Sequence, residues 1–100
     1  MLFDPEEGLY VFEIILGYKI DGETEYTPSS LIQADEPEEA EEKILEHLDN
    51  LEIDQDFWIE EISDPFEIEE YAQDLEENDQ EILPVLNDLT QEEFEDFLNQ

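Results

Sequence analysis

The side chains that could do chemistry in this 100-residue chain are mostly carboxylates, with 34 Asp and Glu against two Lys and no Arg. Paired carboxylates serve acid/base catalysis, but a pair is informative only where its surroundings separate the two pKa values. Nucleophilic catalysis has less support, because the chain lacks Cys and its few Ser lie in no glycine-elbow context. We expect a protein that is not an enzyme, and we expect its single histidine, His47, to be a half-exposed helix residue.

Oxygen-rich segments can also bind calcium or magnesium. In a calcium-binding loop that begins at Asp49, the next two ligand positions are apolar, and in a loop that begins at Asp54 the third ligand position is Trp58. Neither frame has Gly at its sixth position, and the three glycines of the chain are too far apart to form a phosphate-binding loop. We therefore expect no dedicated metal site and no cofactor, and a calcium-dependent binder is the least favoured alternative.

The net charge of -32 restricts the partners. Affinity for a nucleic acid duplex comes mainly from Lys and Arg, and an anionic membrane surface repels negative charge by the same sign argument. The sequence therefore predicts basic protein partners, with no direct binding to nucleic acid or membrane. No apolar run is long enough for a bilayer, no leader pattern precedes residue 10, and the chain has no Cys, so we expect a cytoplasmic protein.

Enough apolar residues are present to form a core, since 39% of the chain is hydrophobic and 11% aromatic. The length predicts a single acidic α+β domain over residues 1–100. Within residues 9–20, every second residue from Tyr10 to Ile20 is apolar, Glu13 and Lys19 interrupt the other face, and Asp21-Gly22 follows at once. This pattern predicts a β-hairpin with a two-residue turn, whose second strand ends or lies at an edge at Pro28, with Leu31 and Ile32 continuing a bent strand.

A helix is expected to begin after Asp35, a suitable N-cap, with Pro37 in its first turn, and to end near Asn50. Its apolar stripe should pack on the sheet and consists of Ala40, Ile44, Leu48 and Leu51, with Leu45 beside them.

Residues 57–62 read as a third strand and residues 66–68 as a short fourth strand that returns antiparallel. From Tyr71 onward the pattern favours two or three short helices interrupted by Pro84, the last one opened by a Thr90–Glu93 capping box. The predicted order is β-β-α-β-(β)-α-α. It is an α+β fold in which helices cover a small antiparallel sheet, made of an N-terminal hairpin plus one or two further strands.

Twenty-two of the acids fall between residues 35 and 81, which makes this segment the candidate binding surface. A charge of -32 equals that of roughly 16 base pairs spanning about 54 Å, whereas a 100-residue domain has a radius of gyration near 13 Å. Trp58 and Tyr71 are candidate apolar contacts, although core packing is the favoured role of Trp58. The predicted partner-binding residues are Glu38, Glu39, Glu41, Glu42, Glu46, Asp49, Asp54, Asp56, Glu60, Glu61, Asp64, Glu67, Glu69 and Glu70.

The segments DEPEEAEEKILEHLDN and DPFEIEEYAQDLEENDQE, together with the absence of Arg, resemble in character the DNA-mimic inhibitors of phages and mobile elements, such as anti-restriction and anti-CRISPR proteins. The resemblance implies an inhibitor that fills the basic cleft of a nucleic-acid-binding protein with carboxylates. We expect the chain to be a monomer or a homodimer. A CRISPR effector or a restriction enzyme is the favoured target. The alternative is a salt-adapted or acidic adaptor or chaperone-like domain, whose charge serves solvation or the binding of basic clients.

Overall fold

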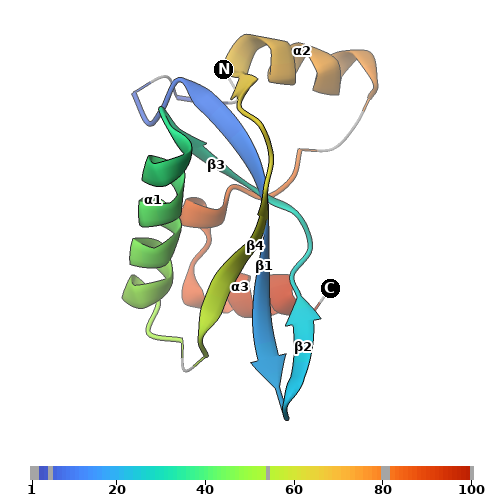
Figure 1. Ribbon diagram of the computed structural model, residues 1–100. Coiled ribbons are helices and arrows are strands. Elements are labelled where there is room, and N and C mark those ends of the chain that lie inside the picture. The colour runs from blue at the N-terminus through green and yellow to red at the C-terminus, as the bar shows by residue number, and fades with distance from the viewer. Residues whose placement is uncertain (1–2, 5, 54, 80–81, 100) are drawn as a thin grey trace.

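The computed structural model describes residues 3–4, 6–53, 55–79 and 82–99 (Figure 1). It confirms the predicted α+β fold, an antiparallel sheet with three α-helices. The sheet has five strands, one more than the predicted maximum of four, because residues 30–34 form a strand of their own. The elements are β1 (Tyr10–Ile20), β2 (Glu23–Tyr26), β3 (Ser30–Ala34), α1 (Pro37–Asn50), β4 (Phe57–Ile62), β5 (Phe66–Glu67), α2 (Ile68–Glu77), the 3-10 turn η1 (Leu86–Asp88) and α3 (Gln91–Leu98).

The sheet is organised around β1, which pairs antiparallel with all four other strands. Along one of its edges, β2 pairs with residues 17–20 and β3 with residues 10–14. Along the opposite edge, β4 pairs with residues 14–18 and β5 with residues 10–11. Each edge of β1 is therefore lined by one interrupted strand, and β3 is the bent continuation of β2 that the sequence predicts.

Two hydroxyl side chains bridge these interruptions in the same way. Thr27 donates its backbone N–H to the carbonyl of Leu16 (2.9 Å), and its Oγ1 accepts the N–H of Leu16 (3.0 Å). Ser63 makes the equivalent pair with Glu13, both bonds being 2.9 Å long. The amides of β1 thus keep partners where the neighbouring strand bends away, which buried backbone groups require.

The β1–β2 connection is the predicted two-residue turn. Asp21 and Gly22 both have positive φ, 52° and 83°, as a hairpin turn of matching twist demands. Its tip extends beyond the helices at the lower end of the molecule in Figure 1.

One face of the sheet carries the main core. The alternating residues Phe12, Ile14 and Leu16 are fully buried there, beneath the apolar stripe of α1 and the aromatic face of α3. Phe57 of β4 joins this layer, with its ring centroid 5.4 Å from that of Tyr18 and 5.5 Å from that of Phe94. The Thr90–Glu93 capping box is present at the start of α3, as predicted.

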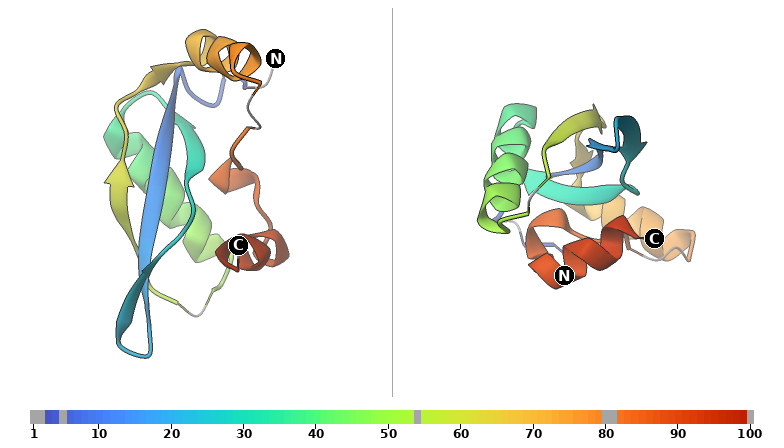
Figure 2. Two further views of the ribbon diagram at one scale, coloured as in Figure 1. Left: turned by 90° about the vertical axis from the view of Figure 1, so that its right-hand side faces the viewer. Right: turned by 90° about the horizontal axis from the view of Figure 1, so that it is seen from below.

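The opposite face is covered over only part of its length. There Val11 and Leu31 pack with Phe3 and with Tyr71 and Leu75 of α2. In Figure 1, α2 lies at one end of β1 and α3 lies toward the other end, and the left view of Figure 2 shows the same separation. Among the described residues, no helix is long and apolar enough to cross a membrane.

Candidate functional site

The exposed side of α1 carries five solvent-exposed carboxylates, which we call the α1 row: Glu38, Glu41, Glu42, Glu46 and Asp49. The sequence folds this way because Ala40, Ile44 and Leu48 are buried on the other side of the same helix. Residues three or four positions apart on a helix have Cβ atoms about 5–6 Å apart, so the row is a continuous strip of negative charge.

The spacing of the α1 row is close to that of one nucleic acid strand. From Glu38 to Asp49 the helix rises about 16 Å, which gives one charge per about 4 Å of axis. A single strand of duplex DNA carries one charge per 3.4 Å. The whole protein measures 41 × 27 × 23 Å and has a radius of gyration of 13.7 Å, so its charge of -32 occupies less length than the 54 Å or so of an equally charged duplex.

Leu45 lies within this strip. The helical pattern predicts a place beside the apolar stripe of α1, but its side chain is 50% exposed. The reason is geometric: Leu45 follows Glu41 by four residues and precedes Asp49 by four, so all three share the solvent side of the helix. An exposed apolar side chain among carboxylates gives the row a contact that charge alone does not provide.

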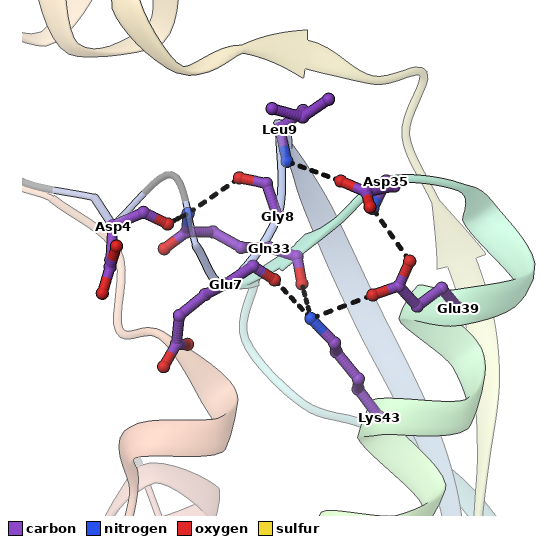
Figure 3. A network of polar contacts seen from close by, with 8 residues as sticks. All are labelled: Asp4, Glu7, Gly8, Leu9, Gln33, Asp35, Glu39 and Lys43. Atoms are coloured by element: carbon purple, nitrogen blue, oxygen red, sulfur yellow. Dashed lines mark hydrogen bonds and ion pairs between the residues drawn. The ribbon is translucent and has the colours of Figure 1, made fainter.

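Glu39 differs from the other predicted residues of α1, because it is engaged inside the molecule (Figure 3). Its Oε1 lies 3.2 Å from Nζ of Lys43, and its Oε2 accepts the backbone N–H of Asp35 at 3.2 Å. Lys43 also donates to the carbonyls of Glu7 and Gln33. This is the single ion pair among the residues that the structure describes, so Glu39 holds Lys43, which bonds to the N-terminal segment at Glu7, and does not extend the row.

The same network explains a wrong prediction at the start of α1. Asp35 was expected to be the N-cap, but the N-cap residue is Glu36, without a side-chain capping bond. Oδ1 of Asp35 instead accepts the backbone N–H of Leu9 at 2.9 Å (Figure 3). The carboxylate is taken by a residue 26 positions earlier, a tertiary contact that a local capping rule cannot anticipate.

The predicted acids of residues 56–70 do not extend the α1 row. Glu61 pairs with Ile15 across the sheet and therefore lies on the face opposite α1, and Glu60 lies on that face too, where it accepts a hydrogen bond from Trp58. Asp56 and Asp64 are exposed next to β4, and Glu67, Glu69 and Glu70 are exposed at β5 and the first turn of α2. Asp54 lies outside the described residues. The predicted residues thus form at least two separate surfaces.

A hollow of about 500 Å³ lies on that opposite face, beyond the part that α2 covers. We call it the sheet hollow; it is lined by Glu13, Ile15, Ser29, Glu60, Glu61, Ile62 and Ser63. The β-bulge in β4 creates it, because the pairing register shifts between Ile15 and Leu16 and places Glu60 and Glu61 side by side there. Glu13, Ile15, Ser29 and Ser63 were not among the predicted site residues, and only the pairing register reveals them.

Tyr71 is not the exposed contact that the sequence suggested. It is 8% exposed, and its hydroxyl donates to Oε1 of Glu13 at 3.1 Å. Burial, and then the charge and hydrogen bond of Glu13, raise the pKa of Tyr71 to about 12. Tyr71 therefore stays neutral near pH 7 and holds one carboxylate of the sheet hollow in place.

His47 is half-buried, as expected of a helix residue beside the apolar stripe, and its Nε2 lies 2.9 Å from the carbonyl oxygen of Leu89. It joins α1 to the segment before α3. No group of three His, Cys, Asp or Glu suited to a metal ion occurs among the described residues.

Comparisons with known proteins gave no match to a family model, to a curated protein or to a solved structure. The geometry and charge of this chain are therefore the basis for inferring its function.

Proposed function

We propose that this protein is a DNA-mimic inhibitor that occupies the basic nucleic-acid-binding cleft of a host defence or DNA-processing protein, with a CRISPR effector or a restriction enzyme as the favoured target. The observation that carries the proposal is the α1 row, five exposed carboxylates on one helix at nearly the axial charge spacing of a nucleic acid strand. The proposed site of action is the cytoplasm of the host cell.

The energetics favour a basic cleft as the partner surface. A cleft lined with Lys and Arg concentrates positive potential, and complementary fields speed diffusional encounter. Lys43 is the cation within α1, and it is already engaged by Glu39 and two backbone carbonyls. The charge of the row is therefore available to a partner.

The experiment measures displacement of a fluorescently labelled 16-base-pair duplex. The duplex is bound to each of several restriction enzymes and to a guide-loaded CRISPR effector, and the protein is titrated in at 50, 150 and 300 mM NaCl. We expect displacement from one or a few of these targets, with an affinity that falls steeply as salt rises.

Polyglutamate of equal total charge is the matched control. If it displaces the duplex from the same targets with equal potency, the arrangement of the carboxylates is irrelevant and the charge serves solvation or the binding of basic clients in general. If the protein displaces the duplex from none of the targets at 50 mM NaCl, the proposal fails for the favoured target classes.

A further inference from the structure

Near the β1–β2 turn, the sheet face opposite α1 carries two aromatic side chains in a row. Gly17 of β1 pairs with Tyr26 of β2 on one side and with Trp58 of β4 on the other, so the three residues face the same way. Tyr26 is 55% exposed, and Trp58 is partly exposed. Neither Trp58 nor the neighbouring Ile15 packs against either hydrophobic core cluster of the described residues. This part of the sheet therefore presents apolar surface outward.

Gly17 determines how the indole lies. A Cβ built on Gly17 would come within 2.4 Å of Nε1 and 2.5 Å of Cε2 of Trp58, so the ring lies against the backbone of β1 where a side chain would otherwise be. The indole Nε1 donates to Oε2 of Glu60 at 2.8 Å. One side of the ring is thus supported by the strand, and its orientation is fixed by a carboxylate of the sheet hollow.

The sheet hollow beside this ring is lined by carboxylates together with an apolar side chain. Ile15 supplies the apolar side chain of this face, and Glu13, Glu60 and Glu61 supply three carboxylates, whereas Ile62 also lines the hollow but pairs with Ile14 and packs against the main core. Glu13 is held by Tyr71, and Glu60 is held by Trp58. Lys19, two residues beyond Gly17 on this face, forms no ion pair within the described part of the chain.

This combination matches the chemistry of an arginine side chain. A guanidinium is planar, stacks on aromatic rings and binds carboxylates through two parallel hydrogen bonds, while its aliphatic stem favours apolar contact. A lysine ammonium is a compact, strongly hydrated charge that cannot make the bidentate contact. A second copy of this chain is a poor occupant, because each copy carries a charge of -32.

We propose that the sheet hollow, with the Trp58 indole beside it, is a docking site for an arginine side chain of a basic protein partner. The proposal rests on the proposed function in so far as that function supplies a basic partner. It adds a second contact surface, on the opposite side of the sheet from the α1 row, that selects arginine over lysine.

Trp58 is the single tryptophan of the chain, so its fluorescence reports binding at this surface directly. The probes are tetra-arginine amide and tetra-lysine amide, titrated at 150 mM ionic strength. We expect tetra-arginine to change the Trp58 emission and to bind at least about fivefold more tightly than tetra-lysine, a preference that stacking and bidentate contacts favour. Equal affinities and equal spectral changes would overturn the proposal.

Two double variants distinguish binding at the sheet hollow from the effect of total charge. Glu60→Gln with Glu61→Gln should lower the affinity for tetra-arginine at least about fivefold, whereas Glu92→Gln with Glu95→Gln on α3 removes the same charge and should lower it less than about twofold. All four side chains are exposed, so both variants should fold. Equal losses in the two would show that the carboxylates act only through total charge.

Gly17→Ala tests the position of the ring without deleting it, because the added methyl group must displace the indole. The variant should lose the preference for arginine, with its circular dichroism spectrum as the check of folding. Retention of the full preference in a folded Gly17→Ala variant would exclude the indole from the site. Concentration-dependent dimerisation abolished by Trp58→Ala would assign the face to a second copy instead.

The two proposals fail separately. Arginine selectivity without duplex displacement from any target would leave the docking site and remove the DNA-mimic function. Duplex displacement without arginine selectivity would leave the function and remove this site.

Discussion

The α1 row and the sheet hollow use the same residue types in different ways. In the row, the side chains of Glu38, Glu41, Glu42, Glu46 and Asp49 stand in solvent on one helix, and no hydrogen bond within the described residues fixes any of their carboxylates. In the hollow, Glu13 is fixed by the Tyr71 hydroxyl and Glu60 by the Trp58 indole. One surface is a strip of carboxylates without hydrogen-bond partners among the described residues, and the other is a set of positioned acceptors beside apolar surface.

Because of this difference, we expect the two surfaces to affect different steps of binding. Unconstrained surface charges act mainly through the summed potential, which raises association rates and is screened by salt. Positioned groups that become desolvated on binding act mainly on the dissociation rate. Acidic composition alone therefore does not identify how a carboxylate contributes, because hydrogen bonding within the protein decides it.

The largest expected effect comes from reversing charge on the α1 row. Glu38→Lys, Glu42→Lys and Glu46→Lys together should slow association with a target found by duplex displacement about 100-fold at 50 mM salt, within the range that electrostatic steering covers. Glu60→Lys with Glu61→Lys should act mainly on dissociation. Stopped-flow association and dissociation rates measure both effects.

The control for this prediction reverses Asp4, Glu6 and Glu7, which changes the net charge by the same amount as the triple variant of α1. We expect it to slow association less than about fivefold, because short-range geometry adds to the summed potential. If the two triple variants slow association equally, only total charge matters, and the division between the two surfaces is wrong.

A smaller effect concerns stability. Unbalanced repulsion should make the fold more stable as salt screens it, so the melting temperature should rise by at least about 5 °C between 10 and 500 mM NaCl, which is about 1 kcal/mol for a domain of this size. Neutralising Glu38, Glu41, Glu42 and Glu46 with Gln should weaken this dependence more than neutralising Glu60 and Glu61. A melting temperature indifferent to salt would show that little repulsion is stored in the fold.

The most local effect tests the support of the sheet hollow. The pKa of Tyr71 is about 12 in the folded protein, above the value near 10 of an unfolded tyrosine. Its contribution to the free energy of unfolding is therefore fully present below pH 10 and is lost as the pH rises through 12. The free energy of unfolding, measured with urea, should fall over this range more for the wild type than for Tyr71→Phe. At pH 7 the variant should be less stable by about 1 kcal/mol, because it lacks the hydrogen bond to Glu13. Parallel pH profiles for the two proteins would contradict this assignment.

Local patterns predicted most of the fold. The alternation of residues 10–20, the Asp21-Gly22 turn and the Thr90–Glu93 capping box are each set by neighbouring residues, and each is confirmed. The separate β3 is less visible, because its residues 30–34 are all buried and lack the alternation that marks a half-exposed strand. Its burial depends on α1 and on Pro84, whose carbonyl accepts the N–H of Leu31 at 2.8 Å.

The candidate site was only partly accessible from sequence. The α1 row follows from three- and four-residue spacing, which is a local property of a helix. The sheet hollow depends on which residues of β4 face Ile15, and a bulge decides this. The withdrawal of Glu39 from the row depends on Lys43 and on the position of the N-terminal loop. The one sequence feature near the hollow is the pair of Gly17 and Trp58, and their pairing is known only from the strand register.

The central position of β1 also bears on how the chain folds. Among the described residues every other strand pairs with β1 and none pairs with another, so no part of this sheet can form before β1 is in place. The final strands reach it from about 50 residues away, as in the pairing of Ile14 with Ile62. Such non-local pairing slows folding, and it makes the assembly of the sheet cooperative. The amides of residues 11–17 should therefore exchange their hydrogens only when the whole molecule unfolds.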